Sequence, residues 1–168
     1  MKERARILKE FEIFEDLSDE QLEAVSEVLK EEVVPEGTEI IRESEKGDTL
    51  YLLLEGSVEI SRSITLKLSR HDYGRREKLL SRMTANERVF FGETGLLGDS
   101  DRMATVVATT RCQLLVLDRA GFEMLSERDP VLGYKVMRKI CKTLVERLRG
   151  ANEDILKLIT ALSIALNR

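Results

Sequence analysis

The middle of the chain consists of short apolar segments separated by glycine-containing turns, and this pattern restricts the chain to a β-rich fold. Residues 45–48 and 55–57 each place a glycine between two apolar segments, and glycine supplies the positive φ that tight turns need. The predicted strands are rich in β-branched or alternating apolar residues, and they cover 33–34, 39–42, 50–54, 57–61, 64–68, 77–83, 105–108 and 113–118. The pattern predicts a mainly β domain over residues 31–128.

Helices are predicted on the N-terminal side of this β domain. Ser18 and Gln21 are spaced as the two ends of a capping box, which marks the start of a helix. We therefore expect a helix over residues 19–30, preceded by helical structure within residues 1–13. Together they form an N-terminal helical segment, residues 1–30.

Two further helices are predicted on the C-terminal side. Asp118 is placed to cap a short helix, and Asp129, followed by Pro130 at the first helical position, begins a much longer one. The long helix is expected over residues 131–165, within a C-terminal segment of residues 129–168.

Apolar residues recur in alternating steps of four and three along this last helix. They are Met137, Cys141, Leu144, Leu148, Ala151, Ile155, Leu158, Leu162 and Ala165. Such a heptad pattern is typical of helices that pair in a coiled coil, so we expect a homodimer through this helix. The alternative is that the helix packs only on its own β domain. Gly150 costs about 1 kcal/mol in a helix interior and is a candidate break.

The segment from Phe91 to Leu97 has the features of a phosphate site. Gly92 and Glu93 stand at the start of a predicted helical turn, and Arg102 follows nine positions after the glutamate. A helix start presents unpaired N–H groups to an anion, and an arginine adds a planar fork of donors. Because phosphate repels a carboxylate, Glu93 is better suited to accept hydrogen bonds from a sugar hydroxyl. The alternative is a structural ion pair between Glu93 and Arg102.

These motifs resemble the cyclic nucleotide-binding domain family. Its phosphate-binding cassette has the pattern Phe-Gly-Glu-Leu/Ile-Ala/Gly-Leu-Leu, followed after a short gap by Arg-Ala/Ser/Thr-Ala-Thr/Ser-Val. This chain has FGETGLL at 91–97 and RMATV at 102–106, and segments 35–41 and 47–60 are similar to the opening of the family's β-roll. The resemblance implies a jelly-roll-like β-roll with N-terminal helices and a long C-terminal helix. Gly95 and the long helix favour the bacterial catabolite-activator type over the kinase regulatory type.

The resemblance also implies the ligand contacts. Glu93 is expected to hold the ribose 2′-hydroxyl, Arg102 the cyclic phosphate, and the amides of residues 92–95 the same phosphate, while the long helix covers the purine as a lid. Met103 stands where a threonine often gives the family cGMP selectivity, so cAMP is the expected ligand, with cGMP or another cyclic nucleotide as the alternative. The implied site residues are Gly92, Glu93, Thr94, Gly95, Arg102, Met103, Thr143, Leu144, Arg147 and Leu148.

Two regions depart from the family pattern. The span 62–89 is longer than a minimal family hairpin, and we expect two extended strands around a polar tip at 69–76, with Gly74 in the turn. Its basic residues are expected to form a solvated loop cluster, and they are Arg70, Arg75, Arg76 and Lys78. Residues 86–88 occupy the place of the family's usual glycine, which leaves the geometry of that loop open.

The composition excludes several classes of protein. A net charge of −4 does not suit a protein that coats nucleic acid, and 42% apolar with 35% charged residues is ordinary for a soluble globular protein. Cys112 and Cys141 have no metal-type spacing and are expected to be buried thiols in a reducing, cytoplasmic setting. The single histidine, His71, is expected at the surface. No secretory signal or membrane span is expected.

The sequence therefore predicts a regulatory binding protein, not an enzyme, which signals through its C-terminal helix to an unknown protein partner. Phosphodiester hydrolysis would need metal ligands or a histidine, and the sequence lacks such a cluster. The activator type carries a helix-turn-helix domain after the long helix. Only 18 residues (168 − 150) follow Gly150, so we expect no DNA binding by this chain. The alternatives are a degenerate relative that binds another ligand and the effector-domain part of a longer transcription regulator.

Overall fold

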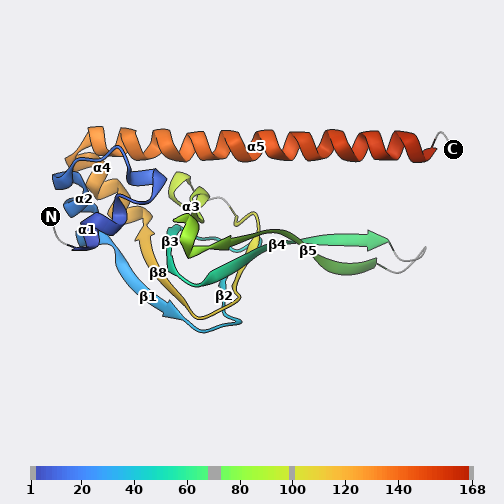
Figure 1. Ribbon diagram of the computed structural model, residues 1–168, viewed down its shortest axis with the longest axis horizontal. Coiled ribbons are helices and arrows are strands. Elements are labelled where there is room, and N and C mark those ends of the chain that lie inside the picture. The colour runs from blue at the N-terminus through green and yellow to red at the C-terminus, as the bar shows by residue number, and fades with distance from the viewer. Residues whose placement is uncertain (1–2, 68–72, 99–100, 167–168) are drawn as a thin grey trace.

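The computed structural model describes residues 3–67, 73–98 and 101–166, in which two four-stranded antiparallel sheets form the body of the protein (Figure 1). The first sheet has the order β1 (Lys30–Val34), β8 (Cys112–Asp118), β3 (Thr49–Glu55) and β6 (Phe90–Phe91). The second has the order β2 (Glu39–Ile41), β7 (Thr105–Ala108), β4 (Ser57–Lys67) and β5 (Tyr73–Thr84). The predicted mainly β fold with flanking helices is confirmed.

The central strands of the first sheet, β8 and β3, bury side chains on both faces, and β8 shows how its sequence achieves this. Successive side chains of a strand point to opposite faces. Leu114 and Val116 therefore face the second sheet, in an inner core with residues such as Val58 and Val106. The intervening leucines of β8, Leu115 and Leu117, belong to an outer core beneath the helices.

Helices cover the outer face of the first sheet. They are α1 (Glu3–Leu8), the 3-10 turn η1 (Glu12–Phe14), α2 (Asp19–Val28), α3 (Thr94–Leu97), α4 (Arg119–Arg128) and the first part of α5 (Pro130–Leu166). A second 3-10 turn, η2 (Ala85–Glu87), packs through Ala85 into the inner core instead. The predicted caps are confirmed: Ser18 accepts from the Gln21 amide, and Asp118 accepts from the Gly121 amide. Asp129 caps α5 by accepting from the amide of Leu132. The helix expected within residues 1–13 is divided into α1 and η1.

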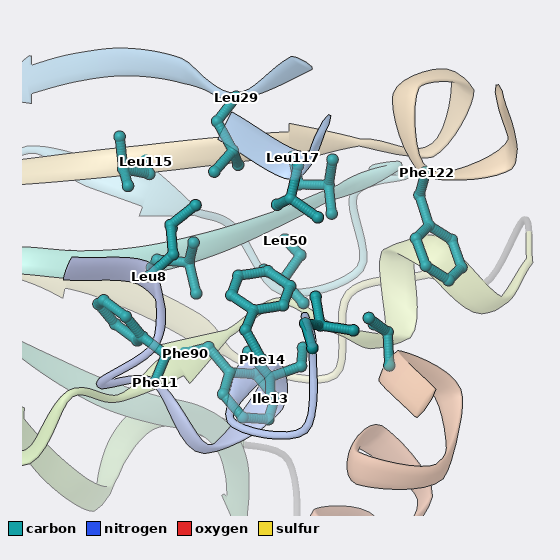
Figure 2. Close-up of a cluster of buried hydrophobic side chains, with 14 of the residues drawn as sticks. Leu8, Phe11, Ile13, Phe14, Leu29, Leu50, Phe90, Leu115, Leu117 and Phe122 are labelled. Atoms are coloured by element: carbon teal, nitrogen blue, oxygen red, sulfur yellow. The ribbon is translucent and has the colours of Figure 1, made fainter. Parts of the chain in front are cut away.

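The outer core joins the N-terminal helices to the base of α5. Phe11, Phe14, Leu50, Leu117 and Phe122 belong to one cluster of buried side chains (Figure 2). Leu132, Val136 and Ile140 of α5 complete this cluster. The first third of α5 is thereby fixed to the body of the protein.

The remainder of α5 extends away from the body, in the same direction as the β4–β5 hairpin (Figure 1). The helix runs without interruption through Gly150, so the candidate break there is wrong. Its large apolar side chains beyond the body are exposed: Leu148, Ile155, Leu156, Leu158, Ile159, Leu162, Ile164 and Leu166. Across the described residues, α5 included, no helix combines the length and apolarity needed to cross a membrane.

The β4–β5 hairpin differs from its prediction. β4 is one strand of 11 residues instead of two shorter ones, and Gly74 pairs with Leu66 within the ladder instead of lying in the turn. Three of the four basic residues expected in a loop are in strand β5, namely Arg75, Arg76 and Lys78. Arg70 and His71 lie outside the described residues. A register shift between Ile60 and Ser61 absorbs an extra residue, which keeps the strands paired where the pattern suggests a break.

One of the two cysteines also differs from expectation. Cys112 is buried in the inner core, but Cys141 on α5 is exposed. The buried face of α5 passes through Val136 and Ile140, which lie four residues apart. Cys141 is one residue beyond this face, which turns it about 100° around the helix toward solvent.

Candidate functional site

The cassette begins where β6 ends, and Gly92 makes the turn. Gly92 has φ of 78°, a conformation that L-residues with a side chain rarely adopt. A β-carbon built on it would also lie 2.9 Å from the carbonyl oxygen of Thr49. Glu93 follows as the residue before α3, and Thr94 and Gly95 form the first turn of that helix. The predicted helical turn therefore exists, and it starts at the predicted place.

Arg102 is buried beside this turn, with a relative exposure of 6%. Its Nη1 donates to the carbonyl oxygen of Gly92 at 2.9 Å, and its Nη2 donates to the carbonyl and hydroxyl oxygens of Thr49 at 3.0 and 2.8 Å. Backbone bonds hold the arginine from the other side, because its amide donates to Glu45 and its carbonyl accepts from Ser44. Arg102 is thus hydrogen-bonded to residues 44–45 through its backbone and to Thr49 and Gly92 through its side chain.

Burial lowers the pKa of Arg102 below its usual value, because the surroundings solvate the guanidinium less well than water does. Tyr51, Asp48 and Glu93 act in the opposite direction. An arginine stays protonated under all ordinary conditions, so the site holds a buried positive charge.

Two glycines give the Arg102 side chain its space. A β-carbon on Gly47 would lie 2.4 Å from Arg102 Nε, and one on Gly95 would lie 2.8 Å from Nη1. Both distances are shorter than van der Waals contact, so a larger residue at either position would displace the guanidinium. The sequence assigns Gly47 only to a turn, and nothing local in it indicates this contact.

Glu93 is buried, with a relative exposure of 4%, and its partner comes from the long helix. Arg147 Nη1 lies 2.5 Å from Glu93 Oε1, and Arg147 Nη2 donates to the carbonyl oxygen of Phe90 at 3.3 Å. Among the described residues there is no direct ion pair between Glu93 and Arg102. The alternative interpretation, a structural ion pair between Glu93 and Arg102, is therefore wrong.

The other site residues that the resemblance implies are less buried than Glu93 and Arg102. Thr143 and Leu144 are half-buried on α5, and Leu144 packs against the outer core. Met103 and Leu148 are exposed, at 63% and 60%. The fold thus brings Gly92, Glu93, Thr94, Gly95, Arg102 and Arg147 together, and it leaves Met103 and Leu148 facing solvent.

The site contains no metal-binding constellation. In the part of the chain that the structure describes, histidine, cysteine, aspartate and glutamate side chains form no group of three or more that could hold an ion. The chemistry that the described side chains offer is hydrogen bonding and charge: a buried guanidinium, a buried carboxylate, and the amides at the start of α3.

Comparison with known proteins agrees with this geometry. Residues 31–129 match the cyclic nucleotide-binding domain family. The chain is 32% identical over 131 residues to a cAMP-dependent protein kinase regulatory subunit of Yarrowia lipolytica, covering 76% of this chain and 30% of that protein. It is 30% identical over 119 residues to a cGMP-dependent protein kinase of Caenorhabditis briggsae, covering 70% of this chain and 15% of that protein. The chain thus spans a third or less of the length of these relatives.

A solved structure shows the same architecture. The catabolite activator protein of Thermus thermophilus superposes with a TM-score of 0.72 at 27% identity, covering 88% of this chain and 62% of that one. Residues 31–129, which match the family, contain both sheets except for Lys30 at the start of β1, together with the cassette, Arg102 and α4. The chain therefore belongs to the cyclic nucleotide-binding domain family.

Proposed function

We propose that this chain is a sensor that binds cAMP in the cassette and signals through α5. The observation that carries the proposal is the burial of Arg102 against neutral acceptors. A buried guanidinium is costly unless a strong acceptor compensates it, and its acceptors among the described residues are two carbonyl oxygens and one hydroxyl. An anionic phosphate is a stronger acceptor, and the bidentate fork of arginine suits it.

The proposed sugar contact is Glu93. A carboxylate can accept several hydrogen bonds, so its oxygens can receive ribose hydroxyls. Arg147 already occupies one of these oxygens from α5. The nucleotide and the long helix would therefore meet at a single carboxylate, which supports α5 as the element that responds to binding. Thr143, Leu144 and Leu148 are proposed to complete the lid over the purine.

The preference for cAMP over cGMP is proposed from Met103. This side chain carries no hydroxyl that could reach a guanine, and it is exposed to solvent. The relatives include kinases of both kinds, so family membership leaves the base undetermined.

Calorimetry with cAMP, cGMP and a cyclic dinucleotide, run side by side, tests the ligand. We expect binding of cAMP, weaker binding of cGMP, and no binding of the dinucleotide. An affinity for cGMP equal to or above that for cAMP would overturn the base preference. Absence of binding to both mononucleotides would overturn the sensor function and favour the degenerate relative.

We also propose that the protein acts as a cytoplasmic homodimer. The apolar side chains of α5 beyond Gly150 are exposed on a single chain, and a surface of this kind is an association site. The two cysteines, which are unpaired, agree with a reducing compartment. The downstream partner is proposed to be a protein, and direct DNA binding by this chain is not proposed.

A further inference from the structure

Arg119, the first residue of α4, reaches across to the C-terminal end of α3. Its Nε and Nη2 donate to the carbonyl oxygen of Gly95 at 3.2 and 3.0 Å, and Nη2 also donates to the carbonyl oxygen of Gly98 at 2.5 Å. The last carbonyls of a helix have no partner within the helix, and a cation at that end is favoured by the helix dipole. Arg119 therefore supplies the C-terminal cap of the cassette helix.

The cap matters because α3 is very short. It contains four residues, Thr94–Leu97, and a helix of this length has no stability of its own in water. Its orientation must be set by bonds to its surroundings. Within the described residues, Arg119 contributes three such bonds from one side chain.

Arg119 also holds the 47–49 turn, against which Gly95 of α3 packs. Its backbone amide donates to the carbonyl oxygen of Asp48 at 2.8 Å. The next residue, Thr49, accepts two hydrogen bonds from Arg102, and Gly95 packs against Arg102 Nη1. Arg119 thus bonds both to α3 and to the turn whose Thr49 accepts hydrogen bonds from Arg102.

We propose that Arg119 is a positioning residue for the phosphate site. It fixes α3 relative to the 47–49 turn, so that the amides of the cassette and the guanidinium of Arg102 point at the same phosphate. This inference rests on the proposed function. The Nε and Nη2 donors of Arg119 are directed at the carbonyl oxygens of Gly95 and Gly98, so the role that we assign to Arg119 is to position α3.

The position of Arg119 also gives the cassette a connection to the long helix. α4 packs through Phe122 and Leu125 into the outer core, which it shares with Leu96 of α3 and Val136 of α5. A shift of α4 against the sheet therefore changes the bonds of Arg119 to α3. The phosphate site and the base of α5 are linked through α4 as well as through Arg147.

The test compares Arg119→Ala and Arg119→Lys with a control, Arg128→Ala. Arg128 is exposed and lies at the other end of the same helix. Its replacement by alanine removes the same charge as Arg119→Ala does. Each protein is titrated by calorimetry with cAMP and with its Rp and Sp phosphorothioate analogues, in which sulfur replaces one or the other exocyclic phosphate oxygen. Hydrogen exchange of the α3 amides is measured without nucleotide.

We expect Arg119→Ala to weaken cAMP binding on the order of tenfold, since hydrogen bonds from a charged group are lost. The ratio of Rp to Sp affinity should change, because a displaced α3 presents its amides differently to the two oxygens. Arg119→Lys should recover part of both effects, and Arg128→Ala should resemble the parent. In the absence of nucleotide, amides of residues 94–97 should exchange faster in Arg119→Ala than in the parent.

Two results would overturn the inference. If the parent binds cAMP and Arg119→Ala binds it with the same affinity and the same Rp-to-Sp ratio, Arg119 does not position the site. If Arg119→Ala accelerates exchange equally throughout the molecule, its effect is general destabilisation. A parent that binds no cyclic nucleotide would instead overturn the proposed function, and this role of Arg119 with it.

Discussion

At the scale of single residues, the proposed phosphate contact depends on Arg102. Truncation of one partner in a buried charged contact costs about 2–5 kcal/mol, so Arg102→Ala should weaken cAMP binding by more than tenfold. Calorimetry measures the loss, and circular dichroism checks that the variant is folded. Arg111→Ala is the matched control, because Arg111 is exposed and carries the same charge. Equal affinities of Arg102→Ala and the parent would refute the phosphate contact.

The proposed sugar contact of Glu93 can be tested by removing each side of it. Glu93→Gln should weaken cAMP binding, because a charge-assisted hydrogen bond becomes a neutral one. The same variant should discriminate less than the parent between cAMP and 2′-deoxy-cAMP, since both changes remove the same interaction. A full set of four calorimetric titrations gives the coupling. If the two losses simply add, Glu93 does not contact the 2′-hydroxyl.

Local backbone structure that follows from spacing could be predicted from the sequence. The helical turn after Gly92 belongs to one short segment, whose pattern determines its backbone. The partner of Glu93 could not be predicted, because Arg147 is 54 positions away and only the path of α5 brings it near. The same holds for Gly47, which makes room for an arginine on a distant loop.

At the scale of elements, the junction of β8 and α4 depends on the charge of Asp118. Its hydrogen bonds to Lys30 and to the Gly121 amide hold the pKa of this carboxyl below its usual value of 3.8. A lowered folded-state pKa means that this stabilisation is present above the unfolded pKa and is lost as the pH falls through the folded one. Asp118→Ala should therefore lower the Tm at pH 7, and the difference from the parent should shrink on acidification below about pH 4. A difference that is independent of pH would contradict this account.

The second prediction at this scale concerns the response of α5. Nucleotide binding should increase the protection of amides 140–155 from hydrogen exchange, because a base packed against α5 favours the closed arrangement. Without nucleotide, Arg147→Ala should exchange faster than the parent around residues 143–150, because its bonds to Glu93 and Phe90 are lost. Protection that rises only over residues 91–106 would show that the domain binds its ligand without moving this helix.

Helices and strands could be predicted where a capping residue or an alternation of apolar and polar residues defined them. The prediction was wrong where it took a single glycine as a break. Ser18, Asp118 and Asp129 cap their helices as expected, since a cap is set by neighbours in the sequence. Gly74 and Gly150 lie inside regular elements instead. The propensity cost of one glycine is about 1 kcal/mol, which the many hydrogen bonds of a long hairpin or helix exceed.

At the scale of the whole molecule, the exposed part of α5 predicts self-association. Leu158→Glu combined with Leu162→Glu should convert a dimer into a monomer, because both side chains are exposed on one chain and lie on the heptad seam. Light scattering at tens of micromolar measures the mass. Ser163→Glu is the control, since it adds a charge on the side of the helix away from the seam. A monomeric mass for the parent would refute the dimer.

The length of α5 gives the molecule a mechanical property. The last buried residue of the helix is Ile140, and the helix continues to Leu166. At a rise of 1.5 Å per residue, the helix beyond Ile140 is roughly 39 Å long, so a rotation of about 10° at its base displaces its tip by roughly 7 Å. Arg147 lies closer to this base than to the tip, so a small displacement of Arg147 at the carboxylate of Glu93 corresponds to a larger displacement of the tip. If nucleotide binding turns the base of α5, the helix would act as a lever that enlarges a change of ångström size at the cassette into a displacement of several ångströms at its tip.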